Sequence, residues 1–195
     1  VWDLSKPRRR PVVLRGHRDG IRQATFDDAG NLFAEDHSGY VRRWSPDDYL
    51  QRKFPIVFDA NRNRIRCTAF TPDGNLIVSP IDASPSVWNL KDIEQPLATF
   101  ADHSYTICAQ VSADGNWLAQ SLQGGAVLLR RIQDGVPLEK AFELKVQNSS
   151  VFSVAFSPDC KLLAAAGIFG EIHLFSVPED NSAPTLIGEI RSSTR

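Results

Sequence analysis

The chain repeats one pattern four times: an apolar strand, a short polar turn and a second apolar strand. The four copies read IRQATFDDAGNLFAE from Ile21, IRCTAFTPDGNLIVS from Ile65, TICAQVSADGNWLAQ from Thr106 and VFSVAFSPDCKLLAA from Val151. The last residue of the first strand marks the period, with steps of 44, 41 and 45 residues between Phe26, Phe70, Val111 and Phe156. A period of this length indicates a repeated structural unit that must pack against its neighbours to bury its apolar faces.

Two further short strands follow each copy. The third strands are YVRRWS from Tyr40, PSVWNL from Pro85, AVLLRR from Ala126 and EIHLFS from Glu171. The fourth are LQRKF from Leu50, PLATF from Pro96, LEKAFEL from Leu138 and TLIGEI from Thr185. Apolar positions alternate with period two, and no segment keeps a helical stripe for three turns. The pattern therefore predicts an all-β chain of four-stranded antiparallel blades, with a period typical of a β-propeller.

The turns between the first two strands place glycine at one fixed position. Gly30, Gly74 and Gly115 fill it in the first three copies, and Cys160 replaces glycine in the fourth. Such turns need a residue with positive φ, which glycine adopts without steric cost. We therefore expect a different or slightly strained turn at Cys160.

These segments resemble WD-repeat propeller blades over essentially the whole chain. VWDL at residues 1–4 is similar to the end of the signature strand of a preceding blade, and Gly16 and His17 are similar to the glycine-histidine that opens a blade. TPDGN from Thr71 and SADGN from Ser112 are similar to the family's turn. The tryptophan column is Trp2, Trp44 and Trp88, continued by Arg130 and Phe175.

The resemblance implies that a buried His, Ser or Thr, Asp and Trp can share hydrogen bonds within a blade. It makes His17, Trp44, Asp82 and Trp88 the structural candidates. Asp82 is the only acidic residue in the predicted Asp column, where the other copies have Ser38, Gly124 and Phe169. A complete network is therefore not expected in every blade, and packing between sheets should supply most of the stability.

The repeat divides the chain into a trailing half blade and four full blades of one propeller. The expected boundaries are 1–14 for the half blade, then 15–54, 55–100, 101–144 and 145–195, the last with a tail. The half blade lacks its first two strands and the chain has no Met. We therefore expect it to be the C-terminal part of a longer protein, poorly soluble alone because repeat arrays need capped ends.

Composition and motifs favour binding over catalysis. The formal net charge is −1 and the pI about 6.5, which speaks against nucleic acid as the main partner. The chain contains no GxSxG, GxxxxGK, HExxH or CxxC motif, and its four histidines occupy different repeat positions. We predict no catalytic residue, metal or cofactor. Three cysteines and apolar runs of at most eight residues favour a cytoplasmic protein without a membrane span.

The loops that enter the blades differ in charge. The loops that enter the first two blades carry the arginines Arg18, Arg22, Arg62, Arg64 and Arg66. The loops that enter the last two blades offer the aromatic residues Tyr105 and Phe152 instead, and the turn after the second strand of the last blade adds Phe169. In a propeller these loops open on one face, and arginine and aromatic residues are favoured in interaction hot spots. We predict a partner-binding rim. The alternative is solvated loop charge, or pairing of arginines with Asp19 and Asp59.

The sequence therefore predicts a non-enzymatic module that binds another protein or another domain of its own chain. The resemblance implies scaffolding or sensing, and the blade pattern is similar to the C-terminal sensor arrays of bacterial signalling NTPases. Two alternatives remain: a small-molecule hydrolase with a funnel site, and a general assembly scaffold. The first strands offer Arg22, Arg66, Ile107 and Phe152 rather than the paired carboxylates that a hydrolase needs.

Overall fold

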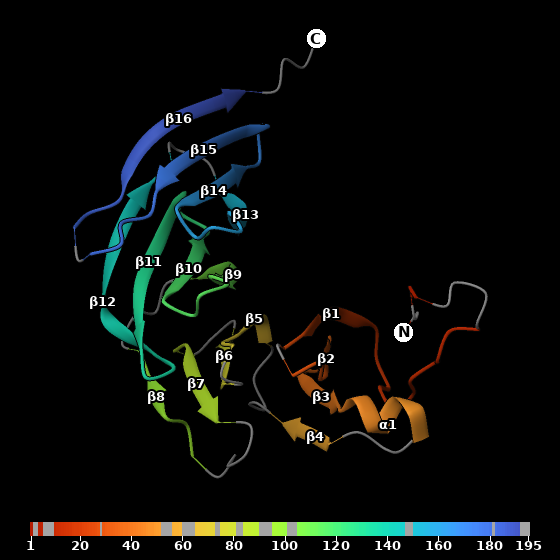
Figure 1. The fold of residues 1–195 in the computed structure, drawn as a ribbon. Helices are drawn as coiled ribbons and strands as arrows, with labels where there is room; N and C mark the ends of the chain where they lie inside the picture. The colour runs from red at the N-terminus through yellow and green to blue at the C-terminus, as the bar shows by residue number, and fades with distance from the viewer. Residues whose placement is uncertain are drawn as a thin grey trace. The chain divides into compact units, whose positions relative to one another are not determined.

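The structure is a computed structural model of residues 1–195. It describes residues 1, 4–5, 10–27, 29–51, 56–59, 65–72, 75–80, 84–89, 95–100, 105–146, 150–180 and 182–191. The chain divides into two compact units, Val1–Arg64 and Ile65–Arg195. Figure 1 labels the helices and strands of both units.

The N-terminal unit contains one antiparallel sheet with the order β1-β2-β3-β4. Its elements are β1 (Ile21–Phe26), β2 (Leu32–Asp36), β3 (Tyr40–Trp44), α1 (Pro46–Gln51) and β4 (Ile56–Asp59). Before the sheet, Val1 and Val12 exchange two main-chain hydrogen bonds of 2.7 and 2.9 Å. Residues 2–3 and 6–9 of the predicted half blade, with Trp2, lie outside the described residues.

The expected fourth strand from Leu50 is wrong, because α1 occupies residues 46–51 and β4 follows it. Ser45 begins the helix: its hydroxyl oxygen accepts from the Asp48 N–H at 3.3 Å, and the Asp48 carboxylate accepts from the Ser45 N–H at 2.8 Å. This is a capping box with Pro46 in the first helical position. The first sheet therefore extends to Asp59, beyond the boundary expected at residue 54.

The C-terminal unit contains three four-stranded antiparallel sheets, each in sequential order, which confirms the predicted four-stranded sheets. The first comprises β5 (Ile65–Phe70), β6 (Asn75–Pro80), β7 (Ser86–Asn89) and β8 (Ala98–Thr99). The second comprises β9 (Thr106–Val111), β10 (Trp117–Leu122), β11 (Ala126–Gln133) and β12 (Val136–Lys145). The third comprises β13 (Val151–Phe156), β14 (Leu162–Gly167), β15 (Glu171–Ser176) and β16 (Thr185–Arg191). Strand β9 contacts both β5 and β13, so the first strands of consecutive sheets are neighbours (Figure 1).

The strand register confirms the repeat and its tryptophan column. In every sheet, three residues form one cross-strand row. The last residue of the first strand pairs with a residue of the second strand, and that residue pairs with the tryptophan-column residue of the third strand. These rows are Phe26–Leu32–Trp44, Phe70–Leu76–Trp88, Val111–Leu118–Arg130 and Phe156–Leu163–Phe175. The last two sheets keep this register although the turn before the second strand is one residue longer.

Two apolar clusters hold the C-terminal unit together. We call the side of a sheet that faces the next sheet along the chain its front face, and the other side its back face. Ile77 and Val87 on the front of the β5–β8 sheet pack with Leu118 and Ile132 on the back of the β9–β12 sheet. The front of the β9–β12 sheet packs in the same way on the β13–β16 sheet through Trp117, Ala119, Val127, Leu129, Leu163, Ala165 and Phe175. Burial on both faces explains why β10 is apolar or uncharged throughout, since removing apolar area from water stabilises at roughly 25 cal/mol per Å².

The turns have the predicted backbone. Gly30 and Gly115 have φ values of 77° and 73°, whereas Gly74 lies outside the described residues. Cys160 has a φ of 59° at the equivalent position, so the expected strain in the fourth turn is confirmed. Within the described residues, no helix combines the length and apolarity needed to cross a membrane.

Candidate functional site

Each first strand contains a β-bulge at the same position. Pairing with the second strand shifts between Ile21 and Gln23 in β1, and at the equivalent places in β5, β9 and β13. The residues left out of the ladder are Arg22, Arg66, Ile107 and Phe152. A bulge frees one residue from regular pairing and redirects its side chain. Of the bulge residues whose side chains the structure describes, Arg22 and Phe152 are exposed and Ile107 is half-buried.

An apolar cluster surrounds the bulge of the last sheet. Phe152 is 51% exposed, and the turn between β14 and β15 exposes Ile168 by 55% and Phe169 by 78%. These residues lie at one end of the sheet, because Val151 pairs with Gly167 and the Ile168 N–H donates to the Ser150 carbonyl at 3.2 Å. Tyr105, half-buried, immediately precedes β9. We call Tyr105, Phe152, Ile168 and Phe169 the aromatic rim.

Hydrogen bonds connect the loops that carry the aromatic rim. The Ser150 hydroxyl donates to the Gln123 carbonyl at 2.8 Å, and the Gln123 N–H donates to the Tyr105 carbonyl at 3.0 Å. The loop before β13 is thus tied to the β10–β11 turn, and that turn to the residue before β9. The loops of two sheets therefore form one fixed framework for the rim.

The predicted arginines are distributed differently from the aromatic residues. Arg18 and Arg22 are exposed in the N-terminal unit. Arg62 and Arg64 lie outside the described residues, and only the backbone of Arg66 is described. The Asp19 carboxylate accepts hydrogen bonds from the Gly20 N–H at 2.7 Å and the Ser38 hydroxyl at 2.8 Å, and these two bonds lower its pKa. Asp19 is thus held by local donors.

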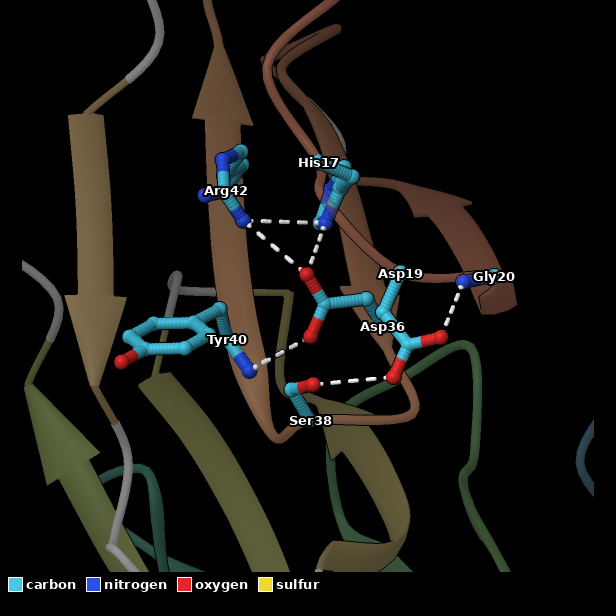
Figure 2. A network of polar contacts seen from close by, with 7 residues as sticks. All are labelled: His17, Asp19, Gly20, Asp36, Ser38, Tyr40 and Arg42. Carbon is cyan, nitrogen blue, oxygen red and sulfur yellow. Dashed lines mark hydrogen bonds and ion pairs between the residues drawn. The ribbon is translucent and has the colours of Figure 1, made fainter.

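A buried polar network joins the loop before β1 to strands β2 and β3. Figure 2 shows the Asp36 carboxylate between His17 and Arg42. Asp36 Oδ2 lies 2.6 Å from His17 Nδ1 and 3.2 Å from Arg42 Nη1, and Asp36 Oδ1 accepts from the Tyr40 N–H at 3.0 Å. The side chains of His17, Asp36 and Arg42 are 8%, 1% and 10% exposed. Removing one partner would leave a buried charge without compensation, so the three residues act as a unit.

Sequence reasoning missed Asp36 and Arg42. The predicted Asp column placed Ser38 in this sheet, but the acidic residue used is Asp36, two positions earlier, while Ser38 binds Asp19. The Trp44 ring lies 5.8 Å from the His17 ring and Trp44 is buried. A useful signal was the acidic pair in AEDHSG, because a charged residue at the end of an apolar strand needs a partner when it is buried.

The other two structural candidates are Trp88 and Asp82. The indole Nε1–H of Trp88 donates to the Ser86 hydroxyl at 2.8 Å within β7. Asp82 lies outside the described residues. In the β9–β12 sheet, Arg130 occupies the tryptophan-column position that Trp88 occupies in the β5–β8 sheet. Arg130 is 3% exposed, donates to Gln120 Oε1 at 3.2 Å and lies 5.2 Å from the Phe100 ring centre. A cation therefore replaces tryptophan in that blade, and an amide oxygen and an aromatic ring are among its partners.

In the C-terminal unit, the bulge at Phe152 and the aromatic rim expose large apolar side chains. Arginine, isoleucine and phenylalanine at the bulges supply charge and apolar contact, whereas proton transfer needs a positioned acid or base. Repeated sheets with contacting first strands, displayed bulges and buried faces between sheets are the features of a β-propeller used for recognition. This is the class of protein that the geometry defines.

Comparisons with known proteins agree with this class. The family model "WD domain, G-beta repeat" matches residues 139–168, which run from β12 to the end of β14. Rat (Rattus norvegicus) apoptotic protease-activating factor 1 is 22% identical over 182 residues, covering 89% of this chain and 14% of the relative. Autophagy-related protein 18 of Meyerozyma guilliermondii is 31% identical over 93 residues, covering 47% of this chain and 16% of the relative. The chain thus spans a small part of either protein.

A solved structure shows the fold. The chain matches one in the crystal structure of the mitotic checkpoint complex with a TM-score of 0.74 and 15% identity, covering 97% of this chain and 58% of that chain. Together with the repeat match and the relatives, this supports a WD-repeat propeller family for the chain. WD40 propellers are generally non-catalytic scaffolds that bind protein partners.

Proposed function

We propose that this chain is a protein-interaction module that binds a partner through the aromatic rim of its C-terminal unit. The observation that carries the proposal is the bulge at Phe152, which takes this side chain out of the strand ladder beside the exposed turn of Ile168 and Phe169. Large apolar side chains on a soluble protein are usually buried, and a group of exposed ones marks an interaction site. The partner should present an apolar or aromatic segment.

The framework under the rim supports this role. The hydrogen bonds from Ser150 to Gln123 and from Gln123 to Tyr105 hold the loops before a partner arrives. Aromatic side chains have few rotatable bonds, so immobilising them loses little conformational entropy. A few aromatic residues near the centre of an interface typically carry most of its binding free energy. We therefore assign the largest share of the affinity to Phe152 and Phe169.

The arginines extend the proposal to the partner's charge. Arg22 and Arg66 occupy the same bulge position as Phe152 in other sheets, and Arg18 is exposed near Arg22 in the sequence. Together with Arg62 and Arg64, they would favour acidic groups on the partner. Charges of this kind mainly accelerate association and select the partner, and salt weakens their effect.

We further propose that the module serves as a sensor within a larger signalling protein of the bacterial NTPase type, whose effector domain it regulates through its own chain or a partner. The rat relative is named for activating a protease and is much longer than this chain, which spans 14% of it. Regulation through a rigid propeller surface would need no catalytic group in these residues.

The test compares partner capture by matched variants. Phe152→Ala with Phe169→Ala should lose at least about tenfold in affinity, because two hot-spot side chains each contribute more than about 1 kcal/mol. Leu138→Ala is the control: Leu138 is 42% exposed on β12 and is not part of the aromatic rim. Proteins captured by the wild type and by the control, but lost by the double variant, would be quantified by mass spectrometry.

A second pair of variants examines the arginines. Arg62→Glu with Arg64→Glu should weaken the same capture while leaving the melting temperature nearly unchanged, and the loss should shrink at high salt. If both double variants capture every protein as well as the wild type does, the aromatic rim and the arginines are not the recognition surface.

A further inference from the structure

Three of the turns that join a second strand to a third have the same backbone form but differ at one position. They span residues 36–39, 122–125 and 167–170, and each ends in a glycine with a φ between 81° and 85°. In the first two, this glycine's N–H donates to the carbonyl of the first turn residue, at 2.9 and 3.3 Å. The residue before the glycine is Ser38, Gly124 or Phe169. Side chains as different as serine and phenylalanine therefore fit at this position.

Gly124 is a glycine that the fold itself does not require. Its φ lies outside the left-handed region, and apart from its chain neighbours no described atom lies within 4 Å of the place that an added Cβ would take. The residue is exposed, and neither its N–H nor its carbonyl has a hydrogen-bond partner among the described residues. Glycine costs conformational entropy on folding and is used where the backbone is strained or where another group approaches closely. Because no strain is present, close approach of a partner is the reason that remains.

The turn that contains Gly124 belongs to the framework of the aromatic rim. Next to it, the Gln123 N–H donates to the Tyr105 carbonyl at 3.0 Å, and the Gln123 carbonyl accepts from the Ser150 hydroxyl at 2.8 Å. The Ser150 carbonyl in turn accepts from the Ile168 N–H at 3.2 Å. The β9–β12 sheet packs on the sheet before it and on the sheet after it. The open space at Gly124 is therefore not the space of a neighbouring sheet.

The chemistry around this space selects its occupant. The four residues tied together there, Tyr105, Gln123, Ser150 and Ile168, are uncharged, so a charged group would lose water there without gaining an opposite charge from them. An extended main chain can pair with the N–H and carbonyl of Gly124 while one of its side chains contacts the rim. Building on the function proposed above, we propose that Gly124 determines the specificity of the aromatic rim. Its partner is an extended, uncharged peptide segment of another protein with one large apolar side chain.

Selection of peptides on the full chain tests this proposal. A phage-displayed library of random peptides is selected on the immobilised wild type, and synthetic copies of the enriched peptides are then titrated in solution by fluorescence polarisation. The enriched peptides should share one tryptophan, phenylalanine or leucine within an uncharged stretch. Enrichment of peptides with a charged residue in place of the apolar one, or of no peptide, would overturn the proposal.

Variants of Gly124 fill the open space in steps. Gly124→Leu should weaken binding of the selected peptides by at least about tenfold, which corresponds to about 1.4 kcal/mol. Gly124→Ala should weaken it less and should raise the melting temperature by about 1–4 °C, because it restricts the unfolded chain without straining the fold. Gly188→Leu is the matched control: an added Cβ at Gly188 on β16 also meets no described atom within 4 Å. This control should bind the peptides like the wild type.

The double variant Phe152→Ala with Phe169→Ala separates this inference from the function on which it rests. If the double variant binds the selected peptides as well as the wild type does, the rim is not the site and the proposed function fails. If the double variant loses the peptides but Gly124→Leu binds them normally, the rim is the site and the inference about Gly124 is overturned. Loss of binding in both, with melting curves that show folded proteins, is the result that we expect.

Discussion

The β9–β12 and β13–β16 sheets have nearly the same design but differ in how much of it is buried. Both have the row of marker, second-strand and column residues, and both have a bulge in the first strand. On both front faces an alanine of the second strand lies opposite a leucine of the third, Ala119–Leu129 and Ala164–Leu174. Among the described residues, only the first of the two has a following sheet packed on that front face. An apolar pattern therefore specifies which side chains share a face, whereas the energetic value of that face depends on what covers it.

The largest expected effect comes from truncating equivalent leucines on the two front faces. Leu129 is fully buried under the next sheet, and Leu174 is its half-buried equivalent. Leu129→Ala should lower the free energy of unfolding by about 3 kcal/mol because it opens a cavity. Leu174→Ala should cost less than about 1 kcal/mol. Thermal unfolding at low concentration measures both, and equal losses would remove the distinction between the two faces.

Substitutions in the turns before β10 and β14 should change the free energy of unfolding by less than the buried leucine substitution does. Gly115 and Cys160 occupy equivalent positions with φ values of 73° and 59°. Cys160→Gly should stabilise by roughly 0.5 kcal/mol, since it removes backbone strain but adds freedom to the unfolded chain. Gly115→Ala should destabilise by about 1–2 kcal/mol, because the new Cβ would be strained and 3.2 Å from Pro72 Cδ.

Melting temperatures of these two variants should therefore move in opposite directions from that of the wild type. A chain of this size shifts by about 2–4 °C for each kcal/mol. If Cys160→Gly lowers the melting temperature, the positive φ in the last sheet is not a source of strain.

The smallest effect concerns acid stability in the same two turns. Burial raises the pKa of Asp114, but hydrogen bonds from the Ser112 hydroxyl and the Asn116 N–H outweigh it and hold the pKa below its ordinary value. The Ser157 hydroxyl and the Lys161 N–H lower the pKa of Asp159 in the same way. Carboxylates with lowered pKa values stabilise the fold above their unfolded pKa, and this contribution disappears as the pH falls through the folded pKa.

Unfolding followed between pH 7 and pH 2 should therefore show stability falling below about pH 4. Asp114→Asn and Asp159→Asn should each lower stability at neutral pH and make the acid loss less steep. A variant whose pH profile stays parallel to that of the wild type would show that its turn contributes nothing to the acid response.

Much of the fold could be predicted from the sequence because the repeat constrains it. Period-two alternation located the strands of the C-terminal unit, and glycine in one turn position predicted positive φ at Gly30 and Gly115. The tryptophan column was extended to Arg130 and Phe175 although neither is tryptophan, and the strand register confirms both. Four copies in register outweigh one unusual residue.

The errors came from local interactions that interrupt the repeat. The expected strand at Leu50 ignored the capping signal in SPDD, which begins α1 at Pro46. Asp36 was missed because the column was read at Ser38, and only the packed sheet brings His17 and Arg42 to this carboxylate. A family column predicts a position, whereas a buried charge is decided by which partners reach it.

The sequence predicted most of the residues of the candidate site but not their geometry. The sequence identified Phe152 and Phe169 but not Ile168. An apolar residue directly after an apolar strand is expected to be buried, and only the structure shows that this turn is exposed. The bulges could not be predicted, since adding one unpaired residue leaves the apolar pattern of the strand almost unchanged. In the last sheet, the residue at the bulge is Phe152, whose side chain is half exposed.

Hydroxyl-radical footprinting of the chain tests the central claim, that two equivalent front faces differ because only one is covered. Ile172 and Ile190 should be oxidised readily, whereas Val127 and Leu144 should be protected in line with their exposures of 0% and 6%. Similar oxidation of the two pairs would contradict the account, because it would mean either that the β13–β16 sheet is covered within the chain or that the β9–β12 sheet is not.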